Sequence, residues 1–251
     1  MLREARDGAT VVLTFDYPAR RNALAMPLRE AVVAAMERIE GDRDVRAVVL
    51  TGAGGTFSAG GDISGMDVAD FAAGRERFRV THRMVRLLVK ASKPVVAAVE
   101  GYAVGAGLSV ALCADTIVAA ADAQFAAGFG RVGLVADLGL PHTLPLRVGH
   151  GRARQILLYG ERLGAEEALR IGLVDHVVPG GTALEAALER ARMFADMAPL
   201  PVAMTKQWLS AGLDAALEWE RDTQSAMFLT ADHAEGKAAF LEKRAPRFTG
   251  R

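Results

Sequence analysis

The fold of this chain is decided by residues 94–107, which read PVVAAVEGYAVGAG. Val95 to Val99 form an uninterrupted apolar run, which is typical of a parallel strand covered on both faces. A glycine-rich segment, Gly101 to Gly107, follows directly. Earlier in the chain, the apolar run Val45 to Thr51 is followed by a second glycine-rich segment, 52–62. Because ligands bind beyond the carboxyl ends of strands in open α/β sheets, the two loops are predicted to form a binding site.

Strands and helices alternate on both sides of these loops. Apolar spacing predicts strands over Val11–Phe15, Asp115–Ala119 and Gly172–Val178, and helices over Pro27–Ile39 and from Phe71 to Leu88. After Gly139 the pattern is mostly helical. The order of strand, helix, strand and glycine loop, used twice, predicts an α/β fold with parallel strands.

Composition excludes several classes of function. The chain of 251 residues carries 30 basic and 30 acidic residues, so no net field attracts nucleic acid. Cys113 is the only cysteine, which rules out an internal disulfide and a cysteine-based zinc cluster, and its apolar neighbours indicate a buried thiol. The first residues lack an apolar signal core, and no stretch is apolar enough to span a bilayer. We therefore expect a protein of the reducing cytoplasm with no membrane contact.

Three further patterns carry less weight. The segment 105–107 lacks the third glycine of a dinucleotide-binding fingerprint, and no Walker lysine follows either loop. Ser109 stands in a sequence close to that of a nucleophile elbow, but it falls inside a predicted helix rather than on the turn. The histidines, at positions 82, 142, 150, 176 and 233, show no metal-binding spacing. We expect them to be solvated or to cap helices, and we expect no metal site.

Six segments together resemble the crotonase family, which is also described as the enoyl-CoA hydratase/isomerase family. They are RNAL (21–24), VRAVVLTG (45–52), FSAGGD (57–62), KPVVAAV (93–99), GYAVGAG (101–107) and FLEKR (240–244). Each is weak alone. Six in the family's order, over nearly the whole chain, identify the sequence as a member.

The resemblance implies a spiral of ββα units over residues 1–198, followed by a helical, trimer-forming region over 199–251. It implies a homo-oligomer, either a trimer or a dimer of trimers. It also implies an acyl-CoA thioester as substrate, with no cofactor beyond the coenzyme A that the substrate carries. Two backbone N–H groups would hold the thioester oxygen, and these donors carry over to Ala59 and Ala106. Such preorganised donors are each worth roughly 2.7–4 kcal/mol of barrier.

The sequence departs from the family's hydratases at the acid positions. Those enzymes hold the attacking water between two glutamates, and this chain has Ser109 and Phe129 at the matching places. Neither side chain can take a proton from water near neutral pH. Asp137, set among apolar residues, instead matches isomerase members in which an aspartate at this place shuttles a proton. An apolar pocket would raise its pKa toward the range of a general base. The alternative is that Asp137 caps the helix that runs toward Leu146.

Further candidates for substrate binding lie in the loops, after the first strand and near the C-terminus. They are Gly61, Asp62, Gly105, Arg20, Arg21, Phe240 and Lys243. Arg20 or Arg21 would meet the phosphates of coenzyme A, unless both are merely solvated. Phe240 and Lys243 match positions that in relatives reach the coenzyme A of an adjacent subunit, and the alternative for Lys243 is a solvated charge in a basic tail. Asp62 is more simply a cap or loop organiser than an acid.

The predicted activity moves a double bond within an acyl-CoA, with Asp137 taking a proton from one carbon and returning it to another. Two alternatives stay open. A hydratase could use Asp137, or water held by Ser109. A non-catalytic acyl-CoA-binding protein would keep the oxyanion pocket without the chemistry.

Overall fold

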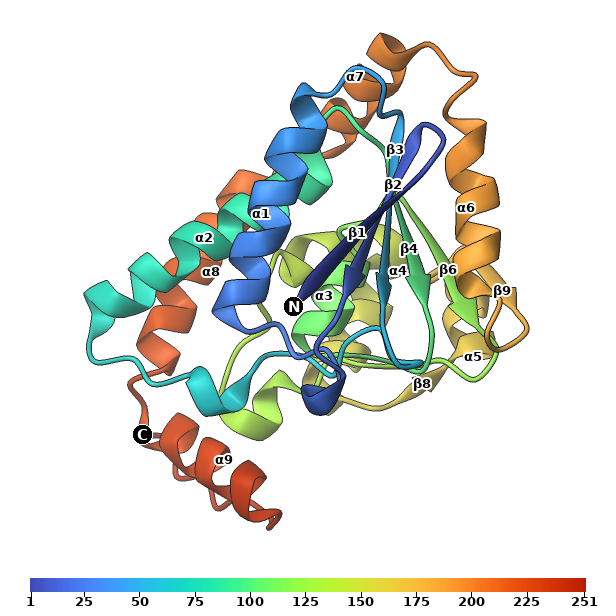
Figure 1. Cartoon of the computed structure of the whole chain (residues 1–251). Helices are drawn as coiled ribbons and strands as arrows, with labels where there is room; N and C mark the ends of the chain where they lie inside the picture. Colours follow the sequence, from blue (N-terminus) through green and yellow to red (C-terminus); the bar gives the residue numbers. More distant parts are fainter.

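The computed structural model describes residues 1–251 and contains two β-sheets surrounded by helices (Figure 1). The larger sheet holds β1 Leu2–Asp7, β2 Thr10–Phe15, β3 Ala47–Gly52, β4 Val95–Val99, β6 Thr116–Ala120 and β9 His176–Val178, in that order. The smaller sheet holds β5 Tyr102–Val104, β7 Gln124–Ala126 and β8 Leu163–Gly164. The α-helices are α1 Met26–Gly41, α2 Phe71–Lys90, α3 Ala106–Ala111, α4 Leu140–Tyr159, α5 Ala165–Arg170, α6 Ala183–Met193, α7 Pro199–Leu209, α8 Leu213–Met227 and α9 Ala231–Glu242. Short 3-10 helices are η1 Pro18–Arg20, η2 Ile63–Gly65 and η3 Phe129–Val132.

The larger sheet is parallel from β2 to β9, and only β1 pairs antiparallel. Alternate residues of its strands enter two separate cores. On β3, Val48 and Leu50 pack in the core formed with α1, α2 and α8, whereas Val49 packs with Ala187 of α6. Figure 1 shows α6 on one side of this sheet and α1 and α2 on the other. Because both faces are covered, the strands carry continuous apolar runs.

The pairs β4–β5 and β6–β7 form the turns of a spiral. In each pair the chain leaves the larger sheet, turns, and adds a short strand to the smaller sheet before a helix begins. The turn between β4 and β5 is at Gly101, whose φ is +57°; a Cβ there would lie 2.4 Å from the carbonyl oxygen of Gly55. Only glycine fits that approach. The predicted α/β spiral of ββα units with a helical C-terminal region is confirmed.

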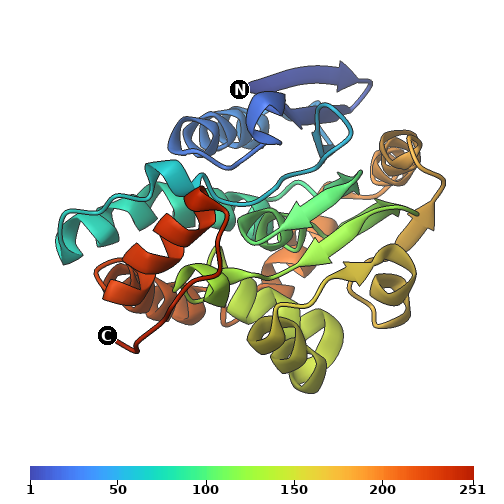
Figure 2. The same cartoon turned by 90° about the horizontal axis from the view of Figure 1, so that it is seen from below.

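The helices after α6 occupy different places. Helix α8 lies along α2 and contributes Leu213 and Leu217 to the main core, so it folds back on its own chain (Figure 1). Helix α9 lies apart from the larger sheet and packs on η3, where a Cβ on Gly236 would lie 2.7 Å from the backbone of Val132. The view from below shows α9 and the C-terminal tail on the near side of the molecule (Figure 2).

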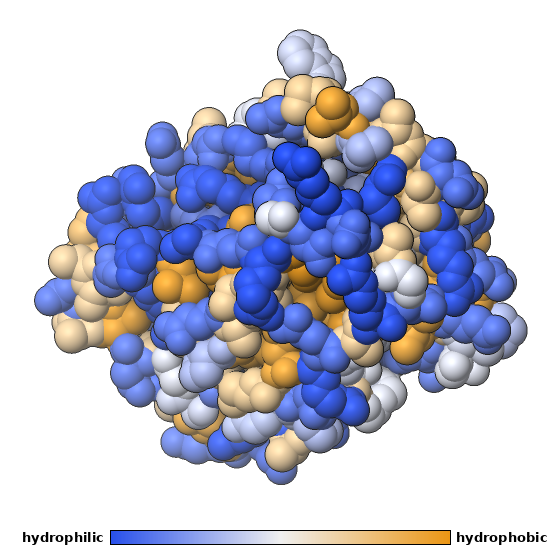
Figure 3. All heavy atoms as spheres, turned by 45° about the horizontal axis from the view of Figure 1, so that its top comes forward, coloured by the Kyte–Doolittle hydropathy of each residue, from blue (hydrophilic) through white to orange (hydrophobic).

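Much of the face seen in Figure 3 is hydrophilic, with apolar residues between the charged ones. The most exposed apolar side chains include Leu200, Met204 and Trp208 of α7, which are 75%, 59% and 79% exposed. Their spacing of four residues puts them on one face of the helix. None of the helices combines the length and apolar character required to cross a membrane.

Candidate active site

The two glycine loops lie side by side, joined backbone to backbone. The Ser58 N–H donates to the Tyr102 carbonyl at 2.8 Å, and the Val104 N–H donates to the Ser58 carbonyl at 3.1 Å. Glycines allow this approach. A Cβ on Gly107 would lie 2.5 Å from the Ser58 oxygen, and one on Gly60, whose φ is +111°, would lie 2.8 Å from the Val104 oxygen. The loops that the sequence predicted to form one site are therefore adjacent.

Only some N–H groups of these loops are free to meet a ligand. The Ala59 N–H donates to the Arg21 carbonyl at 2.9 Å, so the prediction that Ala59 supplies a donor needs correction: its hydrogen is already used. The Gly61 N–H makes no hydrogen bond within the chain, and neither does the N–H of Ala106, the first residue of α3. A Cβ on Gly60 would lie 3.8 Å from the Ala106 nitrogen, so the two segments are close. Gly61 and Ala106 are therefore two donors that the loops leave free.

Asp137 lies between η3 and α4, and only 7% of its surface is exposed. Its Oδ2 accepts a hydrogen bond from Nε2 of Gln224 at 3.4 Å, whereas its Oδ1 is buried without a partner. The alternative interpretation of Asp137 as a helix cap is wrong, because α4 begins at Leu140 and its N-cap is Gly139. A buried polar atom without a partner is unusual and marks a candidate site.

The surroundings of Asp137 favour its protonated form far more than water does. Burial and, after it, the negative charge of Glu220 raise the pKa of Asp137 from 3.8 to about 7. The charges of Arg29 and Arg77 and the hydrogen bond from Gln224 oppose this rise. The raised pKa predicted from the apolar sequence around Asp137 is confirmed, and burial is its main cause.

Two arginines lie close enough to Asp137 for its charge to raise their pKa values. Burial lowers the pKa of Arg77 on α2, while both Asp137 and Asp62 lie near enough to raise it. Burial likewise lowers the pKa of Arg29 on α1 to about 10, while Asp137 raises it. The Arg29 Nε donates to the Leu24 carbonyl at 2.9 Å, and the Leu24 N–H in turn donates to the first glycine loop at 2.8 Å. Arg77 therefore lies near both Asp137 and Asp62, the residue that ends the first glycine loop.

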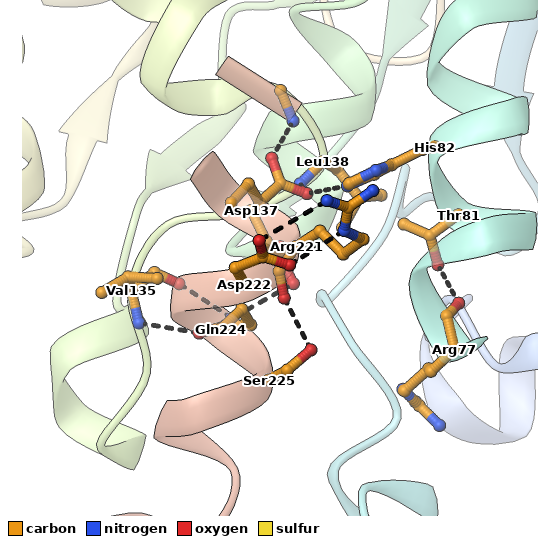
Figure 4. A network of polar contacts seen from close by, with 12 residues as sticks. Arg77, Thr81, His82, Val135, Asp137, Leu138, Arg221, Asp222, Gln224 and Ser225 are labelled. Atoms are coloured by element: carbon orange, nitrogen blue, oxygen red, sulfur yellow. Dashed lines mark hydrogen bonds and ion pairs between the residues drawn. The ribbon is translucent and has the colours of Figure 1, made fainter. Parts of the chain in front are cut away.

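One face of α8 holds the segment that carries Asp137 (Figure 4). The Leu138 and Gly139 N–H groups each donate to the Glu220 carboxylate at 2.8 Å. The same carboxylate lies 2.9 Å from Nε2 of His82 on α2. Glu220 thus joins three segments that are far apart in the sequence.

The sequence analysis missed this part of the site. Glu220 and Gln224 continue the buried stripe that Leu213 and Leu217 begin, with spacings of four, three and four residues. Polar residues at the core positions of an amphipathic helix were the signal that could have found them. The expectation that the histidines are solvated or capping is wrong for His82, which is buried against Glu220, and for the equally buried histidine at position 233.

Comparison with known proteins gives the family. A sequence model described as "Enoyl-CoA hydratase/isomerase" matches residues 5–251. The chain belongs to this family. It is 36% identical to the 1,2-epoxyphenylacetyl-CoA isomerase of Escherichia coli (strain K12) and 39% identical to a probable enoyl-CoA hydratase of Rhodobacter capsulatus. The alignments cover 96% of this chain in both cases, and 95% and 94% of the two relatives.

Solved structures agree with the family assignment. The crystal structure of an enoyl-CoA hydratase from Mycobacterium avium subsp. paratuberculosis matches with a TM-score of 0.89 at 33% identity, over 99% of this chain and 98% of that one. The relatives carry both isomerase and hydratase names. The chain is therefore an acyl-CoA enzyme of the enoyl-CoA hydratase/isomerase family, and the chemistry of its own residues has to distinguish the two activities.

The positions that match the glutamates of the family's hydratases hold no general base. Ser109 is fully buried in α3, and its hydroxyl donates to the Gly105 carbonyl at 3.3 Å. Phe129 begins η3 and packs against the main core. Asp137 remains the carboxylate of this region that has a free oxygen.

The predicted contacts with coenzyme A lie at the surface. Arg20 and Arg21 are exposed at the end of η1. Phe240 and Lys243 are exposed at the end of α9. Phe240 lines a hollow of about 400 Å³ between α9, η3 and the end of α4, and no residue of the glycine loops lines this hollow. Arg21 meets the first glycine loop through its backbone, since its carbonyl accepts from the Ala59 N–H, and no hydrogen bond joins the other three residues to either loop.

The remaining residues that the sequence analysis singled out have clear places in the structure. Asp62 accepts hydrogen bonds from the N–H of Ser64 at 3.2 Å and from its hydroxyl at 2.6 Å, so the interpretation as a cap of η2 is confirmed. Gly105, with φ of +54°, is the N-cap of α3 and shapes the second loop. Cys113 is buried, and burial raises the pKa of its thiol to about 12, as expected of a core cysteine. No three His, Cys, Asp or Glu side chains converge in a way that could hold a metal ion.

Proposed function

We propose that this protein is an acyl-CoA isomerase that moves a double bond through an enolate-like intermediate, with Asp137 as the proton shuttle. The observation that carries the proposal is the free, buried Oδ1 of Asp137 on a carboxyl group whose pKa is raised to about 7. A base with a pKa near the working pH can both remove a proton and return it. The absence of a carboxylate at Ser109 and Phe129 supports isomerisation over hydration.

The glycine loops supply the electrophilic half of the mechanism. The thioester oxygen would accept hydrogen bonds from the N–H groups of Gly61 and Ala106. Negative charge develops on that oxygen as the α-carbon loses its proton, so donors fixed in advance lower the barrier. The position of Ala106 at the first turn of α3 adds unpaired N–H groups beside the developing charge.

The proton movement balances without another reactant. For a 3-enoyl thioester, Oδ1 of Asp137 takes a proton from C2, and the electrons of that bond form the enolate. The enolate then collapses, the proton is returned at C4, and the double bond moves from C3–C4 to C2–C3. No water enters and no electrons leave the substrate, so the products carry every atom of the reactant.

Hydration is the second candidate, because a relative that is 39% identical is named a probable enoyl-CoA hydratase. Asp137 would then take its proton from a water molecule that attacks C3 of a 2-enoyl thioester. Ser109 is poorly suited to hold that water, since its hydroxyl hydrogen is directed to the Gly105 carbonyl.

A pair of assays in heavy water separates these candidates. Purified protein is given a 3-enoyl-CoA or crotonyl-CoA, and products are followed by ultraviolet absorption of the conjugated thioester and by mass. We expect the double bond to move, with deuterium entering C4 whenever the Asp137 proton exchanges with solvent before it is returned, and hydration to be slower by about the 10²–10⁴-fold that a positioned general base contributes. Rapid hydration without a double-bond shift would favour the hydratase. A rise in melting temperature with acyl-CoA, without deuterium exchange, would favour binding alone.

We also propose that the protein works as a homo-oligomer, as its resemblance to the family implies. The exposed stripe of Leu200, Met204 and Trp208 on α7 supports this proposal, because such apolar faces are usually covered. A second copy of the chain is the proposed cover. In the oligomer, Phe240 and Lys243 of one copy would lie near the coenzyme A bound by another.

A further inference from the structure

Glu220 is a fully buried carboxylate whose hydrogen bonds go to the segment carrying Asp137. Its Oε1 accepts from the Leu138 N–H and its Oε2 from the Gly139 N–H, each at 2.8 Å. Its one side-chain partner is His82, whose Nε2 lies 2.9 Å from Oε1. A buried carboxylate without an arginine or lysine is unfavourable unless other donors surround it. The N–H groups of Leu138 and Gly139 therefore hold the Glu220 carboxylate in place, and the carboxylate in turn holds the segment that carries them.

The backbone that Glu220 holds is left-handed, and it is strained at Leu138. Leu138 has a φ of +55° and Gly139 a φ of +77°, so two left-handed residues follow each other directly after Asp137. A leucine rarely adopts this conformation unless its surroundings impose it. Both left-handed residues donate their N–H groups to one carboxylate, which supports the strained conformation of Leu138.

Gln224 holds the other side of Asp137. Its Oε1 accepts from the Val135 N–H and its Nε2 donates to the Val135 carbonyl, both at 3.0 Å. The same Nε2 lies 3.4 Å from Oδ2 of Asp137. Figure 4 shows Gln224 on α8 reaching both Val135 and Asp137. With Oδ2 engaged in this way, Oδ1 is the oxygen left for the substrate.

The same helix sets part of the charge around Asp137. The groups that face Asp137 are Glu220 and Gln224 from α8, Arg29 from α1 and Arg77 from α2, with His82 of α2 against Glu220. After burial, Glu220 is the largest influence that raises the pKa of Asp137, whereas Gln224 lowers it. Two residues one helical turn apart thus act on the same carboxyl group in opposite directions.

We propose that Glu220 and Gln224 are positioning residues: together they fix the segment 135–139 so that Oδ1 of Asp137 faces the substrate. The inference rests on the proposed function in taking Asp137 as the base. Two effects of Glu220 and Gln224 can be measured without turnover: how firmly they hold the segment 135–139, and how they change the titration of the Asp137 carboxyl group.

The test compares Glu220→Gln with Gln224→Met. The Asp137 carboxyl carbon is titrated by carbon-13 NMR in protein with labelled aspartate, and its signal is assigned by its loss in Asp137→Asn. Removing the charge of Glu220 is expected to shift the titration of Asp137 to lower pH. Removing the donor of Gln224 is expected to shift it to higher pH. General loosening of the fold would move both variants in the same direction, so opposite shifts support the proposal and shifts of one sign overturn it.

Kinetics give a second readout. Each variant is expected to lose on the order of tenfold to a hundredfold in kcat, with KM for acyl-CoA nearly unchanged, because Oδ1 is misplaced while the acyl-CoA contacts remain. The acid limb of the rate profile should move with the NMR titration. The matched control is Glu218→Gln, because Glu218 is an exposed residue on the same helix. This variant should change neither kcat nor the position of the acid limb. An equal loss of kcat at every pH, with the acid limb of the rate profile where it is in wild type, would contradict the proposal.

Glu220→Asp covers the case in which Glu220→Gln does not fold. It keeps the charge but shortens the reach to Leu138 and Gly139, so their amide hydrogens should exchange faster and kcat should fall. Unchanged exchange and kcat in this variant would overturn the positioning role. If the titrations move as expected but no isomerisation is found in any variant or the wild type, the proposed function fails, whereas the hold of Glu220 and Gln224 on the segment 135–139 stands. If isomerisation is fast and the Asp137 titrations of the two variants do not shift in opposite directions, the proposed function stands and the inference fails.

Discussion

At the scale of single residues, the two oxygens of Asp137 have different environments. Oδ2 lies near Gln224, and Oδ1 has no partner inside the chain. The carboxyl group keeps its proton up to near-neutral pH, mainly because it is buried. A group with these properties can act as a base on one carbon and an acid on another.

The first prediction concerns the pH dependence of the rate. Asp137 must be ionised to remove a proton, and its pKa is raised to about 7, so kcat/KM should rise with pH and level off above about 7. The measurement is the initial rate of 3-enoyl-CoA isomerisation across pH 5 to 9. A limb that levels off near pH 4, as for an ordinary exposed aspartate, would contradict the assignment.

The second prediction concerns stability. The folded pKa of Asp137, about 7, lies above the ordinary value of 3.8, so the unfolded chain loses this proton first as pH rises. The stability contributed by the bound proton is complete below about pH 4 and is lost between there and about pH 7. Asp137→Asn should remove this loss and unfold at a higher denaturant concentration than wild type at pH 8. The difference in unfolding free energy is on the order of 4 kcal/mol.

Denaturant titrations at several pH values check the stability prediction. Asp122→Asn is the matched control, because Asp122 is exposed. Near pH 4 the unfolding free energies of Asp137→Asn and wild type should approach each other. A constant difference at all pH values would show that the asparagine acts through packing rather than through the proton.

At the scale of elements, the pairing of the two glycine loops decides whether a site exists. The loops contact through Ser58 and the start of α3, where Gly107 leaves no space for a side chain. The apolar strands that precede the loops could be predicted from sequence because each is a continuous buried run. The three short strands of the smaller sheet could not, because none exceeds three residues and each depends on partners far along the chain.

The third prediction compares two glycine-to-alanine changes in these loops. In Gly107→Ala the new Cβ meets the rigid Ser58 backbone at 2.5 Å, so the loops must separate. In Gly61→Ala it meets only the flexible end of Met66, and the N–H is kept. We expect Gly107→Ala to lose about 1–3 kcal/mol of stability and at least tenfold in activity, and Gly61→Ala to lose less than about 1 kcal/mol. Thermal unfolding and the isomerase assay measure both, and equal effects would contradict the loop geometry.

The site could be predicted from sequence only in part. Asp137 could be proposed from sequence because a single carboxylate in an apolar stretch is visible in one dimension. The change of donor from Ala59 to Gly61 was not visible, because which N–H is free depends on the path of the backbone past Arg21. Glu220 was missed because its partners lie about 80 residues away along the chain.

At the scale of the whole molecule, the apolar stripe of α7 remains uncovered. Leu200, Met204 and Trp208 are each more than half exposed, although α8 beside them folds onto the core. Single exposed apolar residues are common, but several on one helix face indicate an interface. The proposed cover is a second copy of the chain.

The fourth prediction tests this interface. Met204→Glu should shift the protein from an oligomer to a monomer in light scattering, because a charge at a buried interface lacks a partner. Met1→Glu, which alters an exposed apolar residue just before β1, is a suitable control once a start methionine is added before it. A wild-type protein that is already monomeric at high concentration, or a variant that keeps the oligomer, would contradict the assignment of this face.

The central claim is that Asp137 carries the proton, and the most direct measurement is the single-turnover rate of double-bond migration in Asp137→Asn. Asparagine keeps the size of the side chain and can still contact Gln224, but it cannot accept a proton near neutral pH. The account predicts a loss of about 10²–10⁴-fold in this rate, with acyl-CoA binding close to that of wild type. A variant that retains more than about a tenth of the wild-type rate would contradict the account, because a positioned general base contributes more than that.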